Sequence, residues 1–588
     1  VKRSGRQNVG APGTRMGFLG VASHKRGANL DAHHEFITDE KENASVRDIE
    51  NSPKSYDDAM TGQERHFWMP STKSELKSLR DVGVHKLVLK PENRKLMKCK
   101  CVFKKKMNST NDTIRCKTRL VARGYSQEKG VDHFNTCAPT LSLNSLRMLM
   151  AISAKLGSSM FNLDFMTAFP CGKNDVVSCV EAPDGFEAAT AEERRTLKSP
   201  RAALLLLKST HGSHQAACMW MHTMFRHLKK HGFQQLESDG CTFDTRRKGI
   251  VIIGICVDDV VCCVEHEEDW AWVKRTLATD FKFRDVGRLK ETLGLQVSRK
   301  TERHYLISQT KCIEKMCEKC NVKEKKRCNA PTTQAQKLAE CEEHDEVDNA
   351  AHRSVVGAVL HVAVATRPDV SHAVSALSRH SQDPRTTHAD AVRRLMMHLL
   401  KTKHCSMSYG HDAGVEAHSD ASYASCPTTL KSASGCHVQV SGGAVTWKSE
   451  RQTVVATSTA EAEHMASSEC TREMMHVSQL IKELGFHINE DGTPSHCDGA
   501  SAMSIGQKPG FTQRSKSMRI AHHNVRQCER NEDMKLLKMK GTDDPADTLT
   551  KGLPRHLNDK HVSCMCNVQM DAENDRPSLF SMRCIGNN

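Results

Sequence analysis

The spacing of hydrophobic positions alternates between helical and strand-like periods along most of the chain. Residues 143–156 carry apolar side chains at helical spacing, and residues 160–165 follow as an apolar strand pattern. Residues 250–264 are almost wholly apolar and predict two strands joined by a turn that holds two adjacent acids. Helical spacing returns between residues 350 and 401. The pattern therefore predicts a mixed chain of α/β and α+β domains.

The last third of the sequence predicts a second α/β unit. Strand patterns occupy residues 417–421 and 495–498, and a hairpin pattern covers residues 435–447. A long helical pattern covers residues 459–484, and a further helix is expected near residue 546. This unit therefore has its own strands and its own long helix.

Length and charge add to this picture. The 588 residues exceed what one hydrophobic core usually supports, so several domains are expected. Residues 1–60 are rich in small, polar and charged residues, which predicts a disordered linker. The formal net charge of +15 is spread along the sequence and favours a polyanionic partner.

The cysteines and the hydropathy of the sequence indicate whether the chain is secreted or inserted in a membrane. The chain has 25 Cys, but no apolar segment follows its basic start, Val-Lys-Arg-Ser, so we expect reduced thiols in an intracellular chain that is not secreted. The longest apolar run, residues 250–264, is too short to span a bilayer and contains Asp258 and Asp259, so no membrane insertion is expected.

The two adjacent acids in this run need a compensating charge. Burying carboxylates beside a strand pair is costly unless a cation or hydrogen bonds compensate. Mg²⁺ prefers hard oxygen ligands and leaves positions for substrate phosphates. Asp258, Asp259 and a third acid, Asp164, therefore suit phosphoryl transfer. The alternative is that the two adjacent acids only cap a hairpin turn, where Asp is common.

A second set of acids lies in the last third of the chain. Asp420 and Asp498 end predicted strands, and Glu461 and Glu463 open a predicted helix. Asp547 lies in the expected terminal helix. Taken singly, such acids are also explained by turns and by the favourable dipole at a helix start.

Four separated motifs carry a family resemblance. They are residues 119–127 (RLVARGYSQ), 163–169 (LDFMTAF), 182–186 (APDGF) and 257–259 (VDD). Their order and spacing resemble the reverse transcriptase domain of copia-type retrotransposons. Residues 366–369 (TRPD) resemble the connector that follows this domain.

Four further blocks are similar to the copia-type ribonuclease H domain. They are residues 418–424 (HSDASYA), 458–463 (STAEAE), 497–498 (CD) and 544–551 (DPADTLTK). The resemblance implies part of a Pol polyprotein, with a right-hand polymerase of fingers, palm and thumb-like connector followed by a ribonuclease H fold. The expected divisions are a linker 1–60, a reverse transcriptase 61–325 that includes the start of the thumb, a helical connector 326–412, a ribonuclease H domain 413–556 and a C-terminal tail 557–588.

The resemblance also implies roles at the polymerase site. Two Mg²⁺ ions, or Mn²⁺ as a substitute, would be held by Asp164, Asp258 and Asp259. Phe169 would exclude a ribose 2′-hydroxyl, and its alternative role is that of an ordinary core aromatic. Four cations would face the incoming triphosphate, or else be solvated surface residues: Lys104, Lys106, Lys117 and Arg119.

At the ribonuclease H site the resemblance implies two further Mg²⁺ ions. Their ligands would be Asp420, Glu461, Asp498 and Asp547. Glu461 is preferred to Glu463 because its position relative to the following helix resembles the catalytic acid of that fold, but the two can be exchanged.

The expected function is RNA-directed DNA synthesis with cleavage of RNA in a hybrid. The expected partners are an RNA template, a DNA primer, an RNA/DNA hybrid, deoxynucleoside triphosphates and other polyprotein products. The expected setting is DNA integration by a transposable element, in cytoplasmic virus-like particles or the nucleus. The alternative is a decayed or co-opted RNA-binding protein, since Cys256, His211 and His464 occupy positions where the family has Tyr. A ribonuclease H acting alone is a third alternative.

Overall fold

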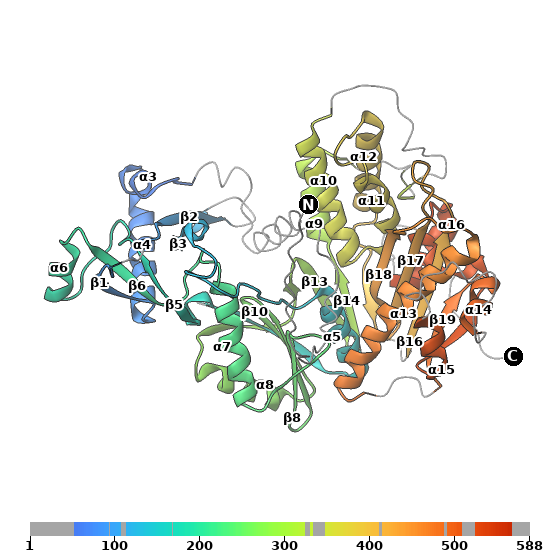
Figure 1. Ribbon diagram of the computed structural model, residues 1–588, viewed down its shortest axis with the longest axis horizontal. Coiled ribbons are helices and arrows are strands. Elements are labelled where there is room, and N and C mark those ends of the chain that lie inside the picture. The colour runs from blue at the N-terminus through green and yellow to red at the C-terminus, as the bar shows by residue number, and fades with distance from the viewer. Residues whose placement is uncertain are drawn as a thin grey trace, which may run out of the picture.

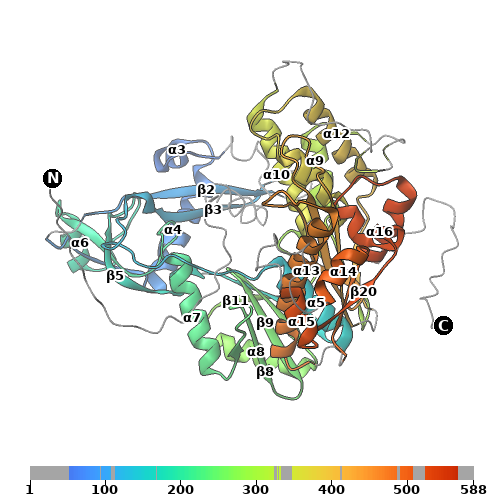
Figure 2. The same cartoon turned by 45° about the vertical axis from the view of Figure 1, so that its right-hand side comes forward.

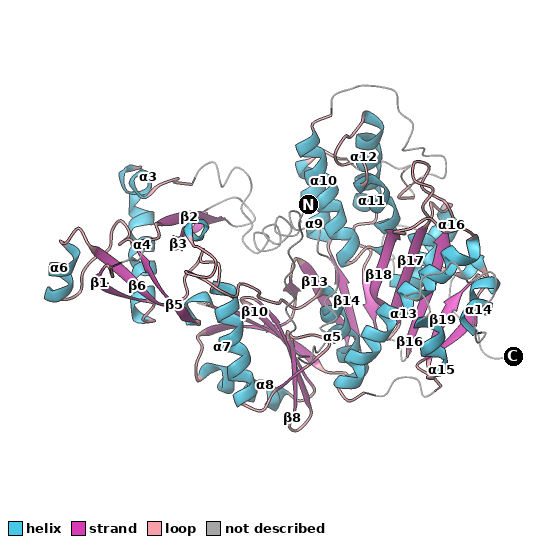
Figure 3. Cartoon of the chain, in the orientation of Figure 1, coloured by secondary structure: helices cyan, strands magenta, loops and turns pink. Residues whose placement is uncertain are grey.

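The computed structural model describes residues 52–566, except 93–94, 108–112, 167, 324–327, 329, 333–346, 411–413, 487–490 and 508–523. Figure 1 shows the N-terminal elements in blue at one end, a green sheet in the middle and the yellow to red elements at the other end. Helices and strands are mixed in each part (Figure 3), so the chain is a mixed α/β multidomain protein. Most of the expected linker and most of the expected C-terminal tail lie outside the described residues.

The N-terminal part combines a three-stranded sheet, a two-stranded ribbon and three helices. It contains α3 (Tyr56–Thr61), α4 (Arg65–Asp81), β1 (His85–Leu89), β2 (Cys99–Met107), β3 (Thr113–Ala122), β5 (Lys173–Val180), α6 (Ala191–Leu197) and β6 (Ala202–Lys208). The sheet order is β1-β6-β5, and β2 pairs only with β3. Trp68 of α4 is fully buried and meets the ring of Phe103 edge-on, which fixes α4 on the ribbon.

An antiparallel six-stranded sheet follows, in the order β11-β4-β10-β9-β8-β7. Its strands are β4 (Ser159–Phe165), β7 (Gln234–Gln235), β8 (Thr242–Arg246), β9 (Ile250–Cys256), β10 (Asp259–Val264) and β11 (Phe283–Arg288). Its helices are α5 (Leu143–Leu156), α7 (Ala216–Lys230) and α8 (Glu267–Ala278). Both β9 and β10 are buried along their whole length, as expected for strands without alternation of polar residues.

A helical bundle and a small sheet connect the six-stranded sheet to the C-terminal part. The sheet is formed by β12 (Glu291–Thr292), β13 (Leu295–Thr301), β14 (His304–Ser308) and β15 (Met407–Tyr409). The helices are α9 (Thr310–Lys319), α10 (Asn349–Ala365), α11 (Ser371–Ser378) and α12 (Thr386–Lys401), which bury a core of their own.

The C-terminal part is a five-stranded sheet in the order β18-β17-β16-β19-β20. Its elements are β16 (Val415–Ser422), β17 (Ala433–Val440), β18 (Gly443–Arg451), α13 (Thr459–Glu483), β19 (Thr493–Cys497), α14 (Ala500–Gln507), α15 (Asn524–Arg530), β20 (Met534–Lys538), the 3-10 helices η6 (Gly541–Asp543) and η7 (Pro545–Leu549), and α16 (Arg555–Cys566). Strand β16 is antiparallel to β17 and parallel to β19. The ends of β16 and β19 therefore lie at the same edge of the sheet.

Helix α5 joins the two large sheets. Both views place it between them (Figures 1 and 2), and it contacts β9, β4 and β18. Arg147 of α5 is fully buried and donates hydrogen bonds to the carbonyl oxygens of Val445 at 2.7 Å and Ala365 at 2.9 Å. One hydrophobic core extends across both sheets, so the six-stranded and five-stranded sheets pack as neighbours and not as separate globules.

Two expected boundaries differ from the structure. Helix α3 begins at Tyr56, inside the expected linker, because Ser55 caps it and Ala59 is buried against α4. Helix α16 continues to Cys566, inside the expected tail, because Met565 and Cys566 are buried in the shared core. Within the described ranges, no helix combines the length and the apolar character needed to cross a membrane.

Candidate active sites

The turn between β9 and β10 carries the first pair of acids. Asp259, the first residue of β10, lies directly opposite Asp164 near the end of β4. Val257 adopts a φ of 50°, which is uncommon for a β-branched residue and makes the turn tight. The carbonyl oxygen of Val257 accepts a hydrogen bond from Trp220 Nε1 at 2.7 Å. A buried tryptophan therefore holds the turn that presents the acids.

The three acids of this site lie close along the backbone, but their carboxylates do not form a compact group. Among the described residues, the groups of ligand atoms within 4.8 Å of one another do not include Asp164, Asp258 and Asp259. Arg284 of β11 lies opposite Asp164, and its Nη2 is 3.2 Å from Asp164 Oδ2. In this structure Asp164 therefore forms an ion pair with a guanidinium.

The other residues expected at this site are an aromatic residue that follows β4 and four cations on the β2–β3 ribbon. Phe169 is partly buried and meets the ring of His211 edge-on, with centroids 5.2 Å apart. Lys104 lies opposite Lys117 across the β2–β3 ribbon, and Arg119 lies opposite Val102. Lys106 is placed only by its register. Because side chains alternate along a strand, Lys104, Lys117 and Arg119 belong to one face of the ribbon.

The second site is more compact. Ligand atoms of Asp420, Glu463 and Asp498 lie within 4.8 Å of one another. Asp420 is 1% exposed, and Thr550 Oγ1 donates a hydrogen bond to its carboxylate. Asp547 lies beside Asp420, with Lys551 Nζ 2.7 Å from Asp547 Oδ1 and 3.7 Å from Asp420 Oδ2. The structure thus brings together three of the four acids expected here.

Glu461 does not join this group. Its Oε2 accepts hydrogen bonds from the backbone N–H of Thr457 at 2.7 Å and from Thr457 Oγ1 at 2.6 Å. Its own N–H donates to Ser458 Oγ, so the side chain belongs to the cap of α13. Two residues later the helix has turned by about 200°, which carries Glu463 to the side that faces Asp420 and Asp498. Glu463, and not the preferred Glu461, is therefore the glutamate of this candidate acid group.

Crowding of the carboxylates perturbs their protonation. Burial, and then the charges of Asp420 and Asp498, raise the pKa of Glu463 to about 9. Burial, followed by Asp420, also raises the pKa of Asp498 and of Asp547. A divalent cation would offset both the burial and the mutual repulsion that raise the pKa of these acids. Their oxygen donors fit Mg²⁺ or Mn²⁺.

The sequence reasoning missed Asp544. Its side chain is 0% exposed, and its Oδ1 accepts from the backbone N–H of Ala546, so it caps η7. Burial raises its pKa well above the ordinary value, with further contributions from Asp420 and Asp547. The signal in the sequence is an Asp directly before Pro at the start of a helical segment.

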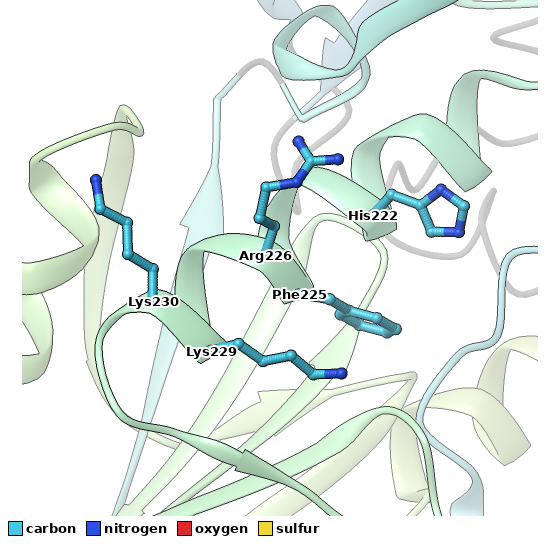
Figure 4. A pocket seen from close by; sticks show the side chains of 5 residues that line it. All are labelled: His222, Phe225, Arg226, Lys229 and Lys230. Carbon is cyan, nitrogen blue, oxygen red and sulfur yellow. The ribbon is translucent and has the colours of Figure 1, made fainter.

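A hollow on the surface of α7 lies apart from both acid groups. It is lined by His222, Phe225, Arg226, Lys229 and Lys230, and Figure 4 shows these side chains extending from the helix. Its lining residues include none of the acids of the two candidate sites. Its cations and its aromatic ring suit a polyanionic backbone.

Residues 82–334 match the family described as reverse transcriptase (RNA-dependent DNA polymerase). The chain is 31% identical over 517 residues to the retrovirus-related Pol polyprotein from transposon TNT 1-94 of Nicotiana tabacum, covering 86% of this chain and 38% of that protein. It is 28% identical over 469 residues to the Pol polyprotein from transposon RE1 of Arabidopsis thaliana, covering 79% of this chain and 31% of that protein. The chain thus spans about a third of these relatives' length.

Among solved structures, the chain is similar to the foamy viral protease-reverse transcriptase in complex with RNA/DNA hybrid. The sequence identity is 11%, the TM-score is 0.46, and the match covers 87% of this chain and 56% of that chain.

Proposed function

We propose that this chain, which carries the reverse transcriptase region of a copia-type retrotransposon Pol polyprotein, synthesises DNA on an RNA template and cleaves the RNA strand of the resulting hybrid. The observation that carries the first activity is the position of Asp259 opposite Asp164 at the ends of two buried strands, inside the matched region. The compact acid group of the C-terminal sheet supports the second activity.

At the polymerase site, Asp164, Asp258 and Asp259 would hold divalent cations. Such ions stabilise the charge that develops on attacking and leaving oxygens in phosphoryl transfer. The chain's own contribution is to fix the turn through Trp220 and to supply the carboxylates. Arg284 must move away from Asp164 when the site is loaded, since its charge competes for the same oxygen. Phe169 would line the sugar position, and the ribbon cations would bind triphosphate.

At the second site, Asp420, Glu463, Asp498 and Asp547 would hold the cations, and Lys551 would give up its contacts with the acids. Glu463 must release its proton for this, because its pKa lies above neutral pH. The five-stranded sheet, with α13 packed on it and a row of acids at one edge, supports a ribonuclease H fold. We also propose that the polymerase part has a right-hand shape of fingers, palm and thumb. The five expected divisions of the chain are kept, except that α3 and α16 belong to the folded parts.

Two purified-protein assays test the proposal. Extension of a DNA primer on an RNA template with Mg²⁺ should be abolished by Asp259→Asn and retained by Asp285→Asn, an acid of the same sheet that pairs with Lys274. Cleavage of RNA in a hybrid should be abolished by Asp498→Asn and retained by Asp543→Asn, an exposed acid that pairs with Lys560. Normal extension by Asp259→Asn would refute the polymerase site.

Cys256 lies opposite Asp259, at a position where the family that the chain resembles has Tyr, and this departure favours a second candidate, a decayed or co-opted RNA-binding protein. In that case the unchanged chain binds primer-template but extends nothing at any Mg²⁺ concentration. Extension by the unchanged chain excludes this candidate.

A further inference from the structure

Three histidines form a row across the middle of the C-terminal sheet. His418 of β16 lies opposite His437 of β17 and beside His496 of β19. The rings are stacked, with centroids 4.6 Å apart for His418 and His437 and 4.7 Å apart for His418 and His496. Glu416 lies two residues before His418, so it shares the same face of the sheet. Imidazole nitrogens and a neighbouring carboxylate are groups that can bind a transition-metal ion.

Glu416, His418 and His496 are already close to coordination spacing. One ligand atom from each lies within 4.8 Å of the others, and His418 Nε2 is 4.0 Å from Glu416 Oε2. A tetrahedral ion with bonds of about 2.0–2.1 Å brings ligand atoms to about 3.3 Å from one another, so small side-chain rotations suffice. Glu416 is about half exposed, which leaves the ion a path from solvent.

The other nitrogen of His418 provides an independent argument. The side chain is 4% exposed, its Nδ1 is buried without a hydrogen-bond partner, and Asp544 Oδ1 lies 4.0 Å away. A histidine that binds a metal through one nitrogen commonly donates the other N–H to a carboxylate, which fixes the ring. His418 fits this arrangement. Its Nε2 faces Glu416, the second ligand, and its Nδ1 faces the buried acid Asp544.

We propose that Glu416, His418 and His496 bind one transition-metal ion of the Zn²⁺ class, at a site distinct from the acid group of Asp420, Glu463 and Asp498. Two nitrogen ligands and one carboxylate suit Zn²⁺, Co²⁺ or Ni²⁺, whereas three carboxylates suit Mg²⁺. Three protein ligands leave a fourth position for water or another ligand. His437 is not a ligand, because its Nε2 contacts Gln439 Nε2 at 3.1 Å and it stacks on the opposite side of His418.

The test measures metal bound by the full chain in excess Mg²⁺, after dialysis against limiting Zn²⁺. His496→Gln and Glu416→Gln remove single ligands. His380→Gln is the matched control, since His380 is partly buried and stacks on His388 at 4.1 Å without belonging to the ligand group. Co²⁺ titration distinguishes nitrogen and oxygen ligands from the many cysteine thiolates, because only thiolates give intense near-ultraviolet charge-transfer absorption.

The unchanged chain and His380→Gln should bind one equivalent of Zn²⁺ more than either ligand variant. Removing a ligand should weaken Zn²⁺ binding by at least about tenfold. Equal binding by all four proteins would overturn the proposal. If His496→Gln unfolds, the half-exposed Glu416→Gln decides the result. Loss of the same equivalent in Asp498→Asn would assign the ion to the acid group and also overturn the proposal. None of these readouts depends on polymerase or nuclease activity.

Discussion

Replacing each of the two glutamates in the first turns of α13 by Gln tests the proposal that Glu463 is a metal ligand and Glu461 a helix cap. Glu463→Gln keeps the shape of the side chain and removes a charge beside Asp420 and Asp498. Glu461→Gln keeps the shape and weakens the hydrogen bonds from Thr457. We expect Glu463→Gln to abolish cleavage of RNA in a hybrid, and Glu461→Gln to retain it.

The size of the effect on metal binding follows from the pKa of Glu463, which burial and the neighbouring carboxylates raise to about 9. Mg²⁺ must displace this proton, which costs about a factor of ten in affinity for each pH unit below 9, or about 3 kcal/mol at pH 7. The apparent Mg²⁺ affinity of the unchanged chain should therefore rise about tenfold per unit between pH 7 and 9. In Glu463→Gln this rise should disappear.

The stability of the metal-free chain should also depend on the protonation of Glu463. Between the ordinary Glu pKa of about 4.3 and about 9, the folded chain binds more protons than the unfolded chain. The free energy of unfolding therefore falls as pH rises through this window, and Mg²⁺ offsets the fall. Glu463→Gln should flatten the pH dependence, whereas Glu461→Gln should keep it and lose about 1–2 kcal/mol of stability at every pH.

The assays are cleavage of a hybrid with a labelled RNA strand, calorimetric Mg²⁺ titration and thermal unfolding at several pH values. The reasoning is refuted if Glu463→Gln cleaves normally, or if Glu461→Gln is folded but inactive. A slope of Mg²⁺ affinity with pH that survives in Glu463→Gln would show that another acid holds the proton.

Three further outcomes test the architecture. Trp220→Phe removes the hydrogen bond to Val257, worth about 1 kcal/mol, and should lower primer extension about tenfold while hybrid cleavage is unchanged. Arg147→Met leaves buried carbonyl oxygens, including that of Val445, without a hydrogen-bond donor. In urea titration it should lower the free energy of unfolding by about 3 kcal/mol, whereas Arg226→Met on the exposed face of α7 should leave it unchanged. Affinity for primer-template should fall steeply as salt rises, and a flat response would contradict the electrostatic origin of binding.

Periodicity predicted the elements that present the acids. The expected strand at residues 160–165 is observed as Ser159–Phe165, and the expected helix at residues 459–484 is observed as Thr459–Glu483. The helix is long and the strand is mostly buried, so apolar spacing alone identifies them. The turn at Asp258 and Asp259 was expected for the same reason, since two acids interrupt an otherwise apolar run.

The choice between Glu461 and Glu463 required a local rule that the periodicity does not contain. Ser458 and Glu461 are three residues apart and fit the capping pattern in which the acid reaches back to the backbone before the helix. That rule assigns Glu461 to the cap and leaves Glu463 as the candidate metal ligand. The partner of Asp164 could not be found this way, because Arg284 is 120 residues away in the sequence and only sheet register brings it opposite.

The shared core limits how far the two proposed activities are independent. Their acids lie in different sheets, so removing one carboxylate changes one chemistry only. The hydrophobic core, in contrast, is shared by both sheets. Helix α5 contributes to the core beneath the β9–β10 hairpin, and its Arg147 binds the backbone of β18. A substitution in that core should therefore reduce both activities together, because it lowers the fraction of folded protein. Loss of both activities in one variant thus argues for lost stability, and only ligand substitutions such as Asp259→Asn and Asp498→Asn report on the sites themselves.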